Sequence, residues 1–144
     1  MAITQLSAFL ENRPGTLCEA IARVTDAGVN IRALSVADTK DFGILRVIVS
    51  DVEKTKDALG EDLIVKETPV IAARMDDRAG ALNSILEVLR QAGVNIEYVY
   101  AFTGAVKGSA YVVLRVDDIE SAEDILSKNG IASLKDEDIS GFLS

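Results

Sequence analysis

Apolar residues recur along this chain with two periods, and both periods occur twice in the same order. Apolar positions three or four apart in two segments predict two amphipathic helices, each with one stripe buried in a core. The stripes consist of Leu17, Ala20, Ile21 and Val24, and of Leu82, Ile85, Leu86 and Leu89. Alternating or continuous apolar runs around these helices predict strands. They cover residues 2–10, 29–38, 44–51 and 63–67, and then 68–75, 94–103, 110–118 and 131–135.

The pattern recurs because the chain contains two copies of one unit. The stretch "ENRPGTL" (residues 11–17) returns 65 positions later as "DDRAGAL" (76–82), and each copy is followed by "AGVNI". With a second, shorter helix expected at 52–60 and at 119–130, each copy has the order βαββαβ. This order predicts an α+β fold of two ferredoxin-like units, each with an antiparallel sheet and two helices on one face.

The connections between these elements are short. We place the first domain at residues 1–68 and the second, with a short C-terminal tail, at 69–144. The joint "KETP" is too short for a flexible linker, so we expect the two units to pack as pseudo-symmetric neighbours. Hairpin turns are expected at 39–43 and 104–108, and Gly28 and Gly93 are expected to end the first helix of each copy in the left-handed conformation.

Charge and composition exclude several classes of function. The chain has 144 residues, and its 15 basic and 23 acidic side chains give a net charge of −8, which disfavours direct binding to nucleic acid or acidic lipid. No apolar stretch approaches the ~20 residues of a membrane-spanning helix, and the N-terminus lacks the pattern of a signal peptide. We therefore expect a cytoplasmic protein without direct membrane contact. One cysteine rules out an intramolecular disulfide.

Catalytic and metal-binding patterns are scarce. The sequence contains no histidine, no nucleophile motif G-x-S-x-G and no phosphate-binding glycine loop. Cys18 has no histidine to activate it and is expected to be inert. The acidic runs 117–120 and 136–138 are typical of helix starts and solvated ends rather than of a metal site. We expect a protein that is not an enzyme and needs no metal or cofactor, while a carboxylate-based mechanism stays open.

The two copies resemble a known family. The βαββαβ order, the loop "ENRPGTL" and the strand start "AGVNI" are similar to those of the ACT domain, a small regulatory module that binds amino acids in many metabolic enzymes. The first copy is especially similar to the regulatory domain of phosphoglycerate dehydrogenase. The resemblance covers nearly the whole chain, as two tandem units without a catalytic domain.

This resemblance implies a ligand site made of the loop after the first strand, the start of the first helix and the start of the second strand, in many members between two ACT domains. The matching positions are Glu11, Asn12, Arg13, Pro14, Gly15, Thr16, Leu17, Asn30 and Ile31, and Asp76, Asp77, Arg78, Ala79, Gly80, Ala81, Leu82, Asn95 and Ile96. In phosphoglycerate dehydrogenase a histidine two residues before the loop asparagine assists binding. Leu10 and Met75 stand there in this chain, so the resemblance does not imply serine as the ligand.

The chemistry of the loop suits a free amino acid. Gly15 and Gly80 have no Cβ, so a ligand could approach the backbone closely. The first amides of the following helix are donors at the positive end of a helix dipole and suit a carboxylate. The side chains of Asn12 and Asp77, with Asn30 and Asn95, could accept hydrogen bonds from an ammonium group.

Structural alternatives accompany each of these assignments. Asn12 and Asp77 could form Asx turns that start the helix, and Pro14 sits where a first helical turn accepts proline. Arg13 and Arg78 could simply be solvated. Asn30 and Asn95 could serve only the turn from helix to strand.

Two functions follow from the sequence. The first is a stand-alone regulatory protein that binds a free amino acid between its two ACT units. The second is a regulatory subunit that docks on a biosynthetic enzyme or a transporter, with ligand binding secondary or lost. A homodimer is expected in addition, because apolar residues on both faces of the strands around Ile44, Ile48, Val112 and Leu114 exceed what helices on one face can cover. Phe142 and Leu143 of the tail could cap an exposed apolar edge.

Overall fold

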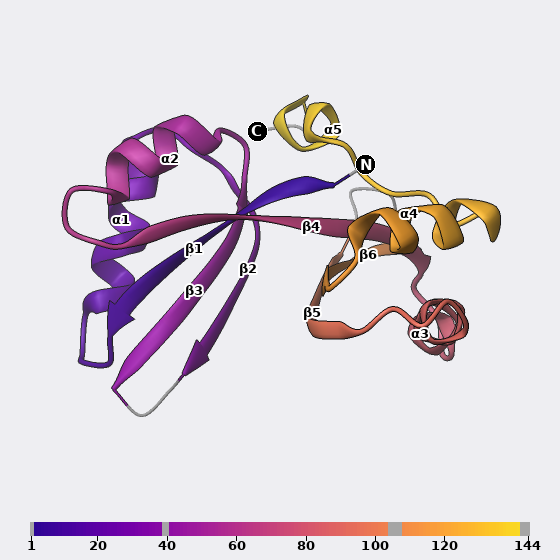
Figure 1. Ribbon diagram of the computed structural model, residues 1–144. Helices are drawn as coiled ribbons and strands as arrows, with labels where there is room; N and C mark the ends of the chain where they lie inside the picture. The colour runs from indigo at the N-terminus through magenta and orange to yellow at the C-terminus, as the bar shows by residue number, and fades with distance from the viewer. Residues whose placement is uncertain (1, 39–40, 104–107, 142–144) are drawn as a thin grey trace. The chain divides into compact units, whose positions relative to one another are not determined.

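The computed structural model describes residues 2–38, 41–103 and 108–141 (Figure 1). The expected hairpin turns at 39–43 and 104–108 lie in part, and Phe142 and Leu143 wholly, outside the described residues. The chain divides into two compact units, which we call the first and the second repeat unit. The first contains residues 4–68 with 137–141, and the second contains residues 69–136 with 2–3.

The first repeat unit is built on three strands whose pairing is antiparallel throughout. Its elements are β1 (Ile3–Glu11), α1 (Thr16–Asp26), β2 (Ile31–Asp38), β3 (Phe42–Val49), α2 (Val52–Leu59) and the start of β4 (Val65–Asp76). β3 pairs with β1 on one side and with β2 on the other. The segment before β4 returns to β1, where the amide of Phe9 donates to the carbonyl of Ile64 at 3.1 Å. The order is the expected βαββαβ.

The second repeat unit has the same plan. The rest of β4 is followed by α3 (Ala81–Gln91), β5 (Ile96–Thr103), β6 (Ser109–Val116) and α4 (Ile119–Lys128), and a short helix, α5 (Asp136–Gly141), follows. β6 pairs antiparallel with β4 and with β5. The last strand expected from the sequence, 131–135, is reduced to an isolated bridge between Ala73 and Ser133. Two hydrogen bonds still tie this segment to β4, because Arg74 donates to Ala132 and Leu134 to Ala72.

Each repeat unit has its own apolar core between helices and sheet. The first core contains Leu6, Ala8, Leu10, Ala20, Val24, Val29, Leu45, Val47, Val49 and Leu59. The second contains Ile71, Ala73, Ile85, Leu89, Val94, Val112, Leu114, Val116, Ala122 and Leu126. The expectation that the whole helical stripe is buried is wrong at its first position, because Leu17 and Leu82 remain 40% and 39% exposed. The buried residues of α3 are Ala81, Ile85 and Leu89, which lie four residues apart on one line of the helix. Leu82 lies to one side of this line.

The "AGVN" stretch ends α1 and α3 in the same way. Gly28 and Gly93 have φ of 74° and 72°, which confirms the expected left-handed conformation. Gly28 donates to the carbonyl of Thr25 at 2.9 Å and Val29 donates to that of Val24 at 3.3 Å, the hydrogen-bond pair of a Schellman motif. The second copy repeats both bonds from Gly93 and Val94. The valine after each glycine is buried in its core, so this motif closes the helix and directs the chain into the next strand.

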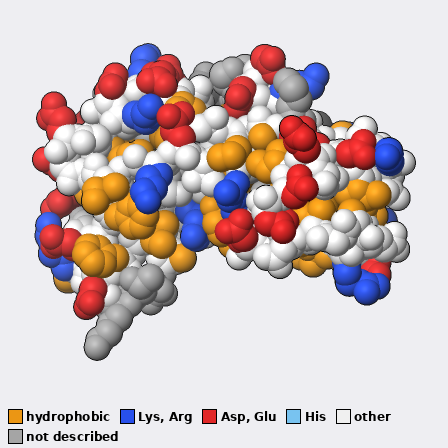
Figure 2. Space-filling model, in the orientation of Figure 1, with side chains coloured by type: hydrophobic (Ala, Val, Ile, Leu, Met, Phe, Trp, Pro, Cys, Tyr) orange, Lys and Arg blue, Asp and Glu red, His pale blue; other side chains and the backbone are white. Residues whose placement is uncertain are grey.

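The surface argument for self-association needs correction. Val112 and Leu114 belong to the core of the second repeat unit, and Ile48 is buried as well, so none of the three offers apolar surface to a partner. Large apolar side chains are exposed elsewhere, at Leu34 (51%) on β2 and Val99 (42%) at the matching position of β5. Figure 2 shows hydrophobic side chains at the surface among acidic and basic ones. None of the described helices is long and apolar enough to cross a membrane.

Candidate ligand site

The duplicated loop is a tight turn that leads into a helix. Gly15 has φ 89° and ψ −13°, and Gly80 has φ 87° and ψ −11°. The amide of Thr16 donates to the carbonyl of Arg13 at 3.4 Å, and that of Ala81 to Arg78 at 3.3 Å. A positive φ at the third residue of a four-residue turn defines type II, which favours glycine there and proline before it. The first copy has Pro14-Gly15 at these two positions, and the second has Ala79-Gly80.

This turn corrects two details of the expected loop. Pro14 lies in the turn before α1 rather than in its first helical turn, because the helix starts at Thr16, after the left-handed Gly15. Of the amides expected to be available to a carboxylate, that of Thr16 is used inside the turn. The amides of Gly15 and Leu17 form no hydrogen bond with any residue in the described part of the chain. Two donors therefore remain at the start of α1.

Backbone contacts hold the loop in both copies. Arg13 donates to the carbonyl of Glu11 at 3.0 Å, and Arg78 donates to that of Asp76 at 2.9 Å. The residue between them donates across to the neighbouring hairpin, with Asn12 bonded to the carbonyl of Asp41 at 3.2 Å. In the second copy Asp77 makes this bond to Gly108 at 2.9 Å. In the first copy the hydroxyl of Thr16 also donates to the carbonyls of Glu11 at 2.8 Å and Arg13 at 3.1 Å. Ala81 has no hydroxyl at the matching position, yet the backbone bonds are the same, so the shape of the loop does not depend on this side chain.

The loop arginines are held by ion pairs. Arg13 Nε lies 3.0 Å from a carboxylate oxygen of Glu11, and Arg78 Nε lies 3.6 Å from one of Asp76. All four side chains are more than half exposed, so each pair contributes little to stability, about 0–1 kcal/mol. The interpretation that these arginines are merely solvated is therefore too simple, because each is oriented by the acidic residue that ends the preceding strand.

The polar side chains of Asn12 and Asp77 do not start the helix. Neither α1 nor α3 has a side-chain hydrogen bond at its N-cap, which is Gly15 or Gly80. Both side chains are exposed and form no hydrogen bond or ion pair within the described residues. The Asx-turn alternative is therefore wrong, and the two groups remain available to a ligand.

Asn30 and Asn95 anchor the start of the second strand through their backbones. The amide of Asn30 donates to Ser50 Oγ at 2.9 Å, and its carbonyl accepts from the Ser50 amide at 2.9 Å. In the second copy the carboxylate of Asp117 accepts a hydrogen bond from the amide of Asn95 at 3.0 Å. The amide of Asp117 donates to the carbonyl of Asn95 at 3.1 Å. The side-chain amides of both asparagines have no partner among the residues that the structure describes. The backbone serves the turn from helix to strand, and the side chain is uncommitted.

Loop and asparagine lie at opposite ends of each repeat unit. Glu11 pairs with Phe42 at the first residue of β3, whereas Asn30 bonds to Ser50 just past its last residue. Eight residues of strand separate these points, a distance of about 26 Å. Neither unit therefore brings its own loop and asparagine together, and a site shared between the two copies stays a prediction. Ile31 and Ile96, also expected at the site, are partly buried against the two cores.

The acidic run at 117–120 has a structural role, as expected. Asp118 is the N-cap of α4, and its carboxylate accepts hydrogen bonds from the amide of Ser121 at 3.1 Å and from the Ser121 hydroxyl at 2.8 Å. These bonds, that of the amide first, lower the pKa of Asp118 from its ordinary value. Within the described residues, no group of histidine, cysteine and acidic side chains is arranged to hold a metal ion. Cys18 is exposed on α1.

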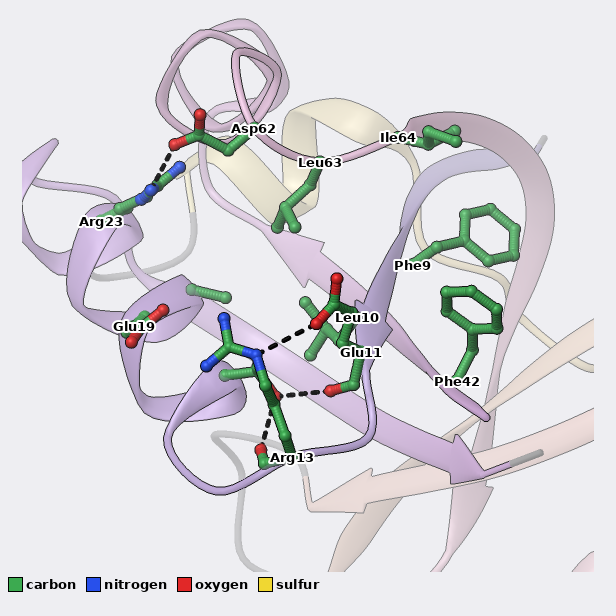
Figure 3. Close-up of a pocket in the computed structure, with 12 residues that line it drawn as sticks. Phe9, Leu10, Glu11, Arg13, Glu19, Arg23, Phe42, Asp62, Leu63 and Ile64 are labelled. Atoms are coloured by element: carbon green, nitrogen blue, oxygen red, sulfur yellow. Dashed lines mark hydrogen bonds and ion pairs between the residues drawn. The ribbon is translucent and has the colours of Figure 1, made fainter. Parts of the chain in front are cut away.

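A cavity of 410 Å³ opens beside the first loop, entirely within the first repeat unit (Figure 3). Its walls come from the end of β1, from α1, from the start of β3 and from the segment before β4. Besides the loop residues Glu11, Arg13 and Thr16, it is lined by Phe9, Leu10, Glu19, Ala20, Arg23, Phe42, Asp62, Leu63 and Ile64. Sequence reasoning missed this second group. A signal was present, because Phe9 and Phe42 are apolar residues with no apolar counterpart in the second copy.

Comparison with known proteins identifies the class of domain. Residues 1–143 match the family described as "ACT domain pair". The chain belongs to this family. A crystal structure of protein BT0572 from Bacteroides thetaiotaomicron is 36% identical, with a TM-score of 0.90 over 97% of this chain and 96% of that chain.

More distant structures share the fold. The ligand-free regulatory subunit of aspartate kinase from Thermus thermophilus superposes with a TM-score of 0.66 at 11% identity, over 87% of this chain and 91% of that chain. A structure of aspartokinase alpha and beta subunits superposes with a TM-score of 0.58 at 16% identity, over 90% of this chain and 92% of that chain. No curated protein matches the chain. None of these findings singles out phosphoglycerate dehydrogenase.

Proposed function

We propose that this ACT domain pair is a regulatory protein that binds a free amino acid at its duplicated loops. One observation carries the proposal: both copies keep the same turn with a positive-φ glycine and leave a polar side chain next to it without a partner in the described chain. Such a turn presents amides to a carboxylate, and the side chain of Asn12 or Asp77 can accept from an ammonium group.

In this proposal each ligand lies between a loop of one domain and the asparagine of the other, with domains at 1–68 and 69–144. The distance between loop and asparagine within one unit supports such sharing, because a single amino acid cannot span about 26 Å. Two loops then allow up to two ligands. The second loop should hold the ammonium group more strongly, because the carboxylate of Asp77 makes a charge-assisted hydrogen bond and the side-chain amide of Asn12 does not.

The partner is proposed to be an enzyme of amino acid biosynthesis in the cytoplasm. The regulatory subunit of aspartate kinase from Thermus thermophilus has this fold and nearly this length, which is consistent with a domain pair acting on a separate catalytic chain. The exposed apolar residues Leu34, Val36 and Val99 favour a second candidate, a docking subunit with little ligand binding, because such side chains suit a protein interface.

A thermal-shift screen of the proteinogenic amino acids tests the proposal. A ligand at 100 times its dissociation constant adds about 2.7 kcal/mol to the free energy of unfolding, so a binder raises the melting temperature clearly. Titration calorimetry then compares the wild type with Asn12→Ala and Asp77→Ala, which remove exposed groups without partners. Asp26→Ala, at the exposed end of α1, is the control. A flat screen contradicts amino acid binding and favours the docking subunit.

A further inference from the structure

The two copies of the loop carry their acidic side chain at different positions. Three residues before the loop glycine, Asn12 of the first copy matches Asp77 of the second. Four residues after that glycine the difference is reversed, because Glu19 of the first copy matches Ser84. Apart from the acidic residue that pairs with the loop arginine, each loop therefore has one carboxylate, which precedes the glycine in the second copy and follows it, on the helix, in the first.

Glu19 holds its carboxylate beside the glycine of the first loop. It lies in the first turn of α1, and its amide donates to the carbonyl of Gly15 at 2.9 Å. Side chains on a helix lean towards its N-terminus, and a Cβ built on Gly15 would lie 3.9 Å from Oε1 of Glu19. Because an amide nitrogen is about 2.5 Å from the Cβ of its own residue, this oxygen is within about 6.5 Å of the amide nitrogen of Gly15. The carboxylate therefore borders one of the two amides that have no partner in the described chain.

The second copy has no side chain in the corresponding space. The amide of Ser84 donates to the carbonyl of Gly80 at 3.0 Å, and its hydroxyl donates to the same carbonyl at 3.1 Å. A Cβ built on Gly80 would meet no atom within 4 Å. α3 forms without an acidic residue in its first turn, so the shared fold does not require the carboxylate of Glu19.

The carboxylate of Glu19 is uncommitted. It is exposed and forms no hydrogen bond or ion pair within the described residues. The two arginines that line the cavity of Figure 3 with it are paired elsewhere, Arg13 with Glu11 and Arg23 with Asp62. A carboxylate only accepts hydrogen bonds, and an ammonium group only donates them, so the two groups are complementary.

We propose that Glu19 binds the ammonium group of the ligand at the first loop, as Asp77 does at the second. The ligand carboxylate then accepts from the free amides of Gly15 and Leu17. In a free amino acid the two charged groups are about 3 Å apart, and each makes hydrogen bonds of about 2.8 Å, so one head group reaches from the amide of Gly15 to Glu19. The inference rests on the proposed function for the class of ligand and for the loop, and it adds the residue that offsets the neutral side chain of Asn12.

NMR titration with glycine tests the inference, because the amide signals of Gly15 and Gly80 report the two loops separately in one sample. Glycine is the probe because it consists of the head group alone, and acetate is the matched ligand without an ammonium group. Glu19→Gln is expected to weaken glycine binding at the first loop about tenfold or more, since a charge-assisted hydrogen bond is lost. The second loop should be unchanged. Asp26→Asn removes a carboxylate from the exposed end of the same helix and should bind as the wild type does.

A further pair of variants moves the carboxylate instead of removing it. Glu19→Ser installs the residue of the second copy and should weaken the first loop as Glu19→Gln does. Adding Asn12→Asp gives the first loop the same two residues as the second, and this double variant is expected to regain most of the lost affinity. Both positions are exposed, and melting temperatures of the ligand-free variants show that each has folded.

The outcomes separate this inference from the proposed function. If Glu19→Gln binds glycine at the first loop with wild-type affinity, Glu19 serves only the start of the helix and the inference is wrong. It is also wrong if acetate loses as much affinity as glycine, because the substitution then changes the loop rather than the contact with the ammonium group. If glycine moves the signals of neither loop while another amino acid raises the melting temperature, the inference fails and amino acid binding stands. A flat thermal-shift screen contradicts both.

Discussion

Gly80→Ala should destabilise the protein through backbone strain alone. Gly80 has φ 87°, and a Cβ built there meets no atom within 4 Å, so there is no steric clash to add. An alanine held in the left-handed region costs about 1–2 kcal/mol. The unfolding entropy of about 2.1 cal/mol/K per residue gives about 0.3 kcal/mol/K for 144 residues. The melting temperature should therefore fall by about 3–7 °C.

Calorimetric or circular dichroism melting measures this change, and two substitutions control it. Gly80→Asn should cost less, because asparagine tolerates a positive φ at this turn position. Gly43→Ala lies in β3, where the added Cβ would be 3.9 Å from a methyl group of Val36, an ordinary contact, so stability should not fall. If Gly80→Ala melts at the wild-type temperature, the loop adopts another turn and the reasoning is refuted. Gly15 has φ 89°, so a larger residue there is strained in the same way. A loss of ligand binding in a Gly15 variant would therefore not by itself locate the ligand site.

Three further outcomes are expected. Ala79→Pro should stabilise the protein by about 0.4–1 kcal/mol, because Pro14 occupies the same position of the same turn and proline restricts the unfolded chain; a lower melting temperature would contradict this. Asp118→Asn should lower the free energy of unfolding at pH values above 3.8, the ordinary carboxyl pKa, and this loss should disappear as the pH falls through the lowered pKa of folded Asp118. Denaturation of both proteins at a series of pH values measures the loss, and a loss that does not change with pH would contradict the prediction. Light scattering should show that the wild type is a homodimer, and the double substitution Leu34→Lys and Val99→Lys should weaken this dimer. A wild type that is monomeric at micromolar concentration would contradict the prediction.

Much of the fold could be predicted because its signals are local. The Schellman motif at Gly28 and Gly93 depends on six consecutive residues, and the loop turn on four, so the sequence contains everything that determines them. The βαββαβ order follows from the change between periods of about 3.6 and 2 residues. Duplication of these signals made the interpretation firmer, since each copy checked the other.

The site was predicted less completely. The loop residues could be named from the sequence, but the cavity joins Phe42 and Asp62 to them from distant parts of the chain. Phe42 reaches Phe9 only through the register of β1 against β3, which the sequence does not specify to the residue. Asp62 reaches Arg23 only because the segment before β4 returns to β1.

The sequence by itself determined the duplicated unit, its order of elements, the glycine turns that close the first helix of each copy, and the ACT resemblance, because each depends on neighbours in the chain. The tertiary structure decided which residues these elements bury. Leu17 and Leu82 fit the helical stripe, yet the line that faces the sheet runs through Ala20 and Val24 and through Ala81 and Ile85. Burial depends on the rotation of each helix against its sheet, and long-range packing sets that rotation. For the same reason the cavity could be recognised only once residues distant in the chain had been brought to one place.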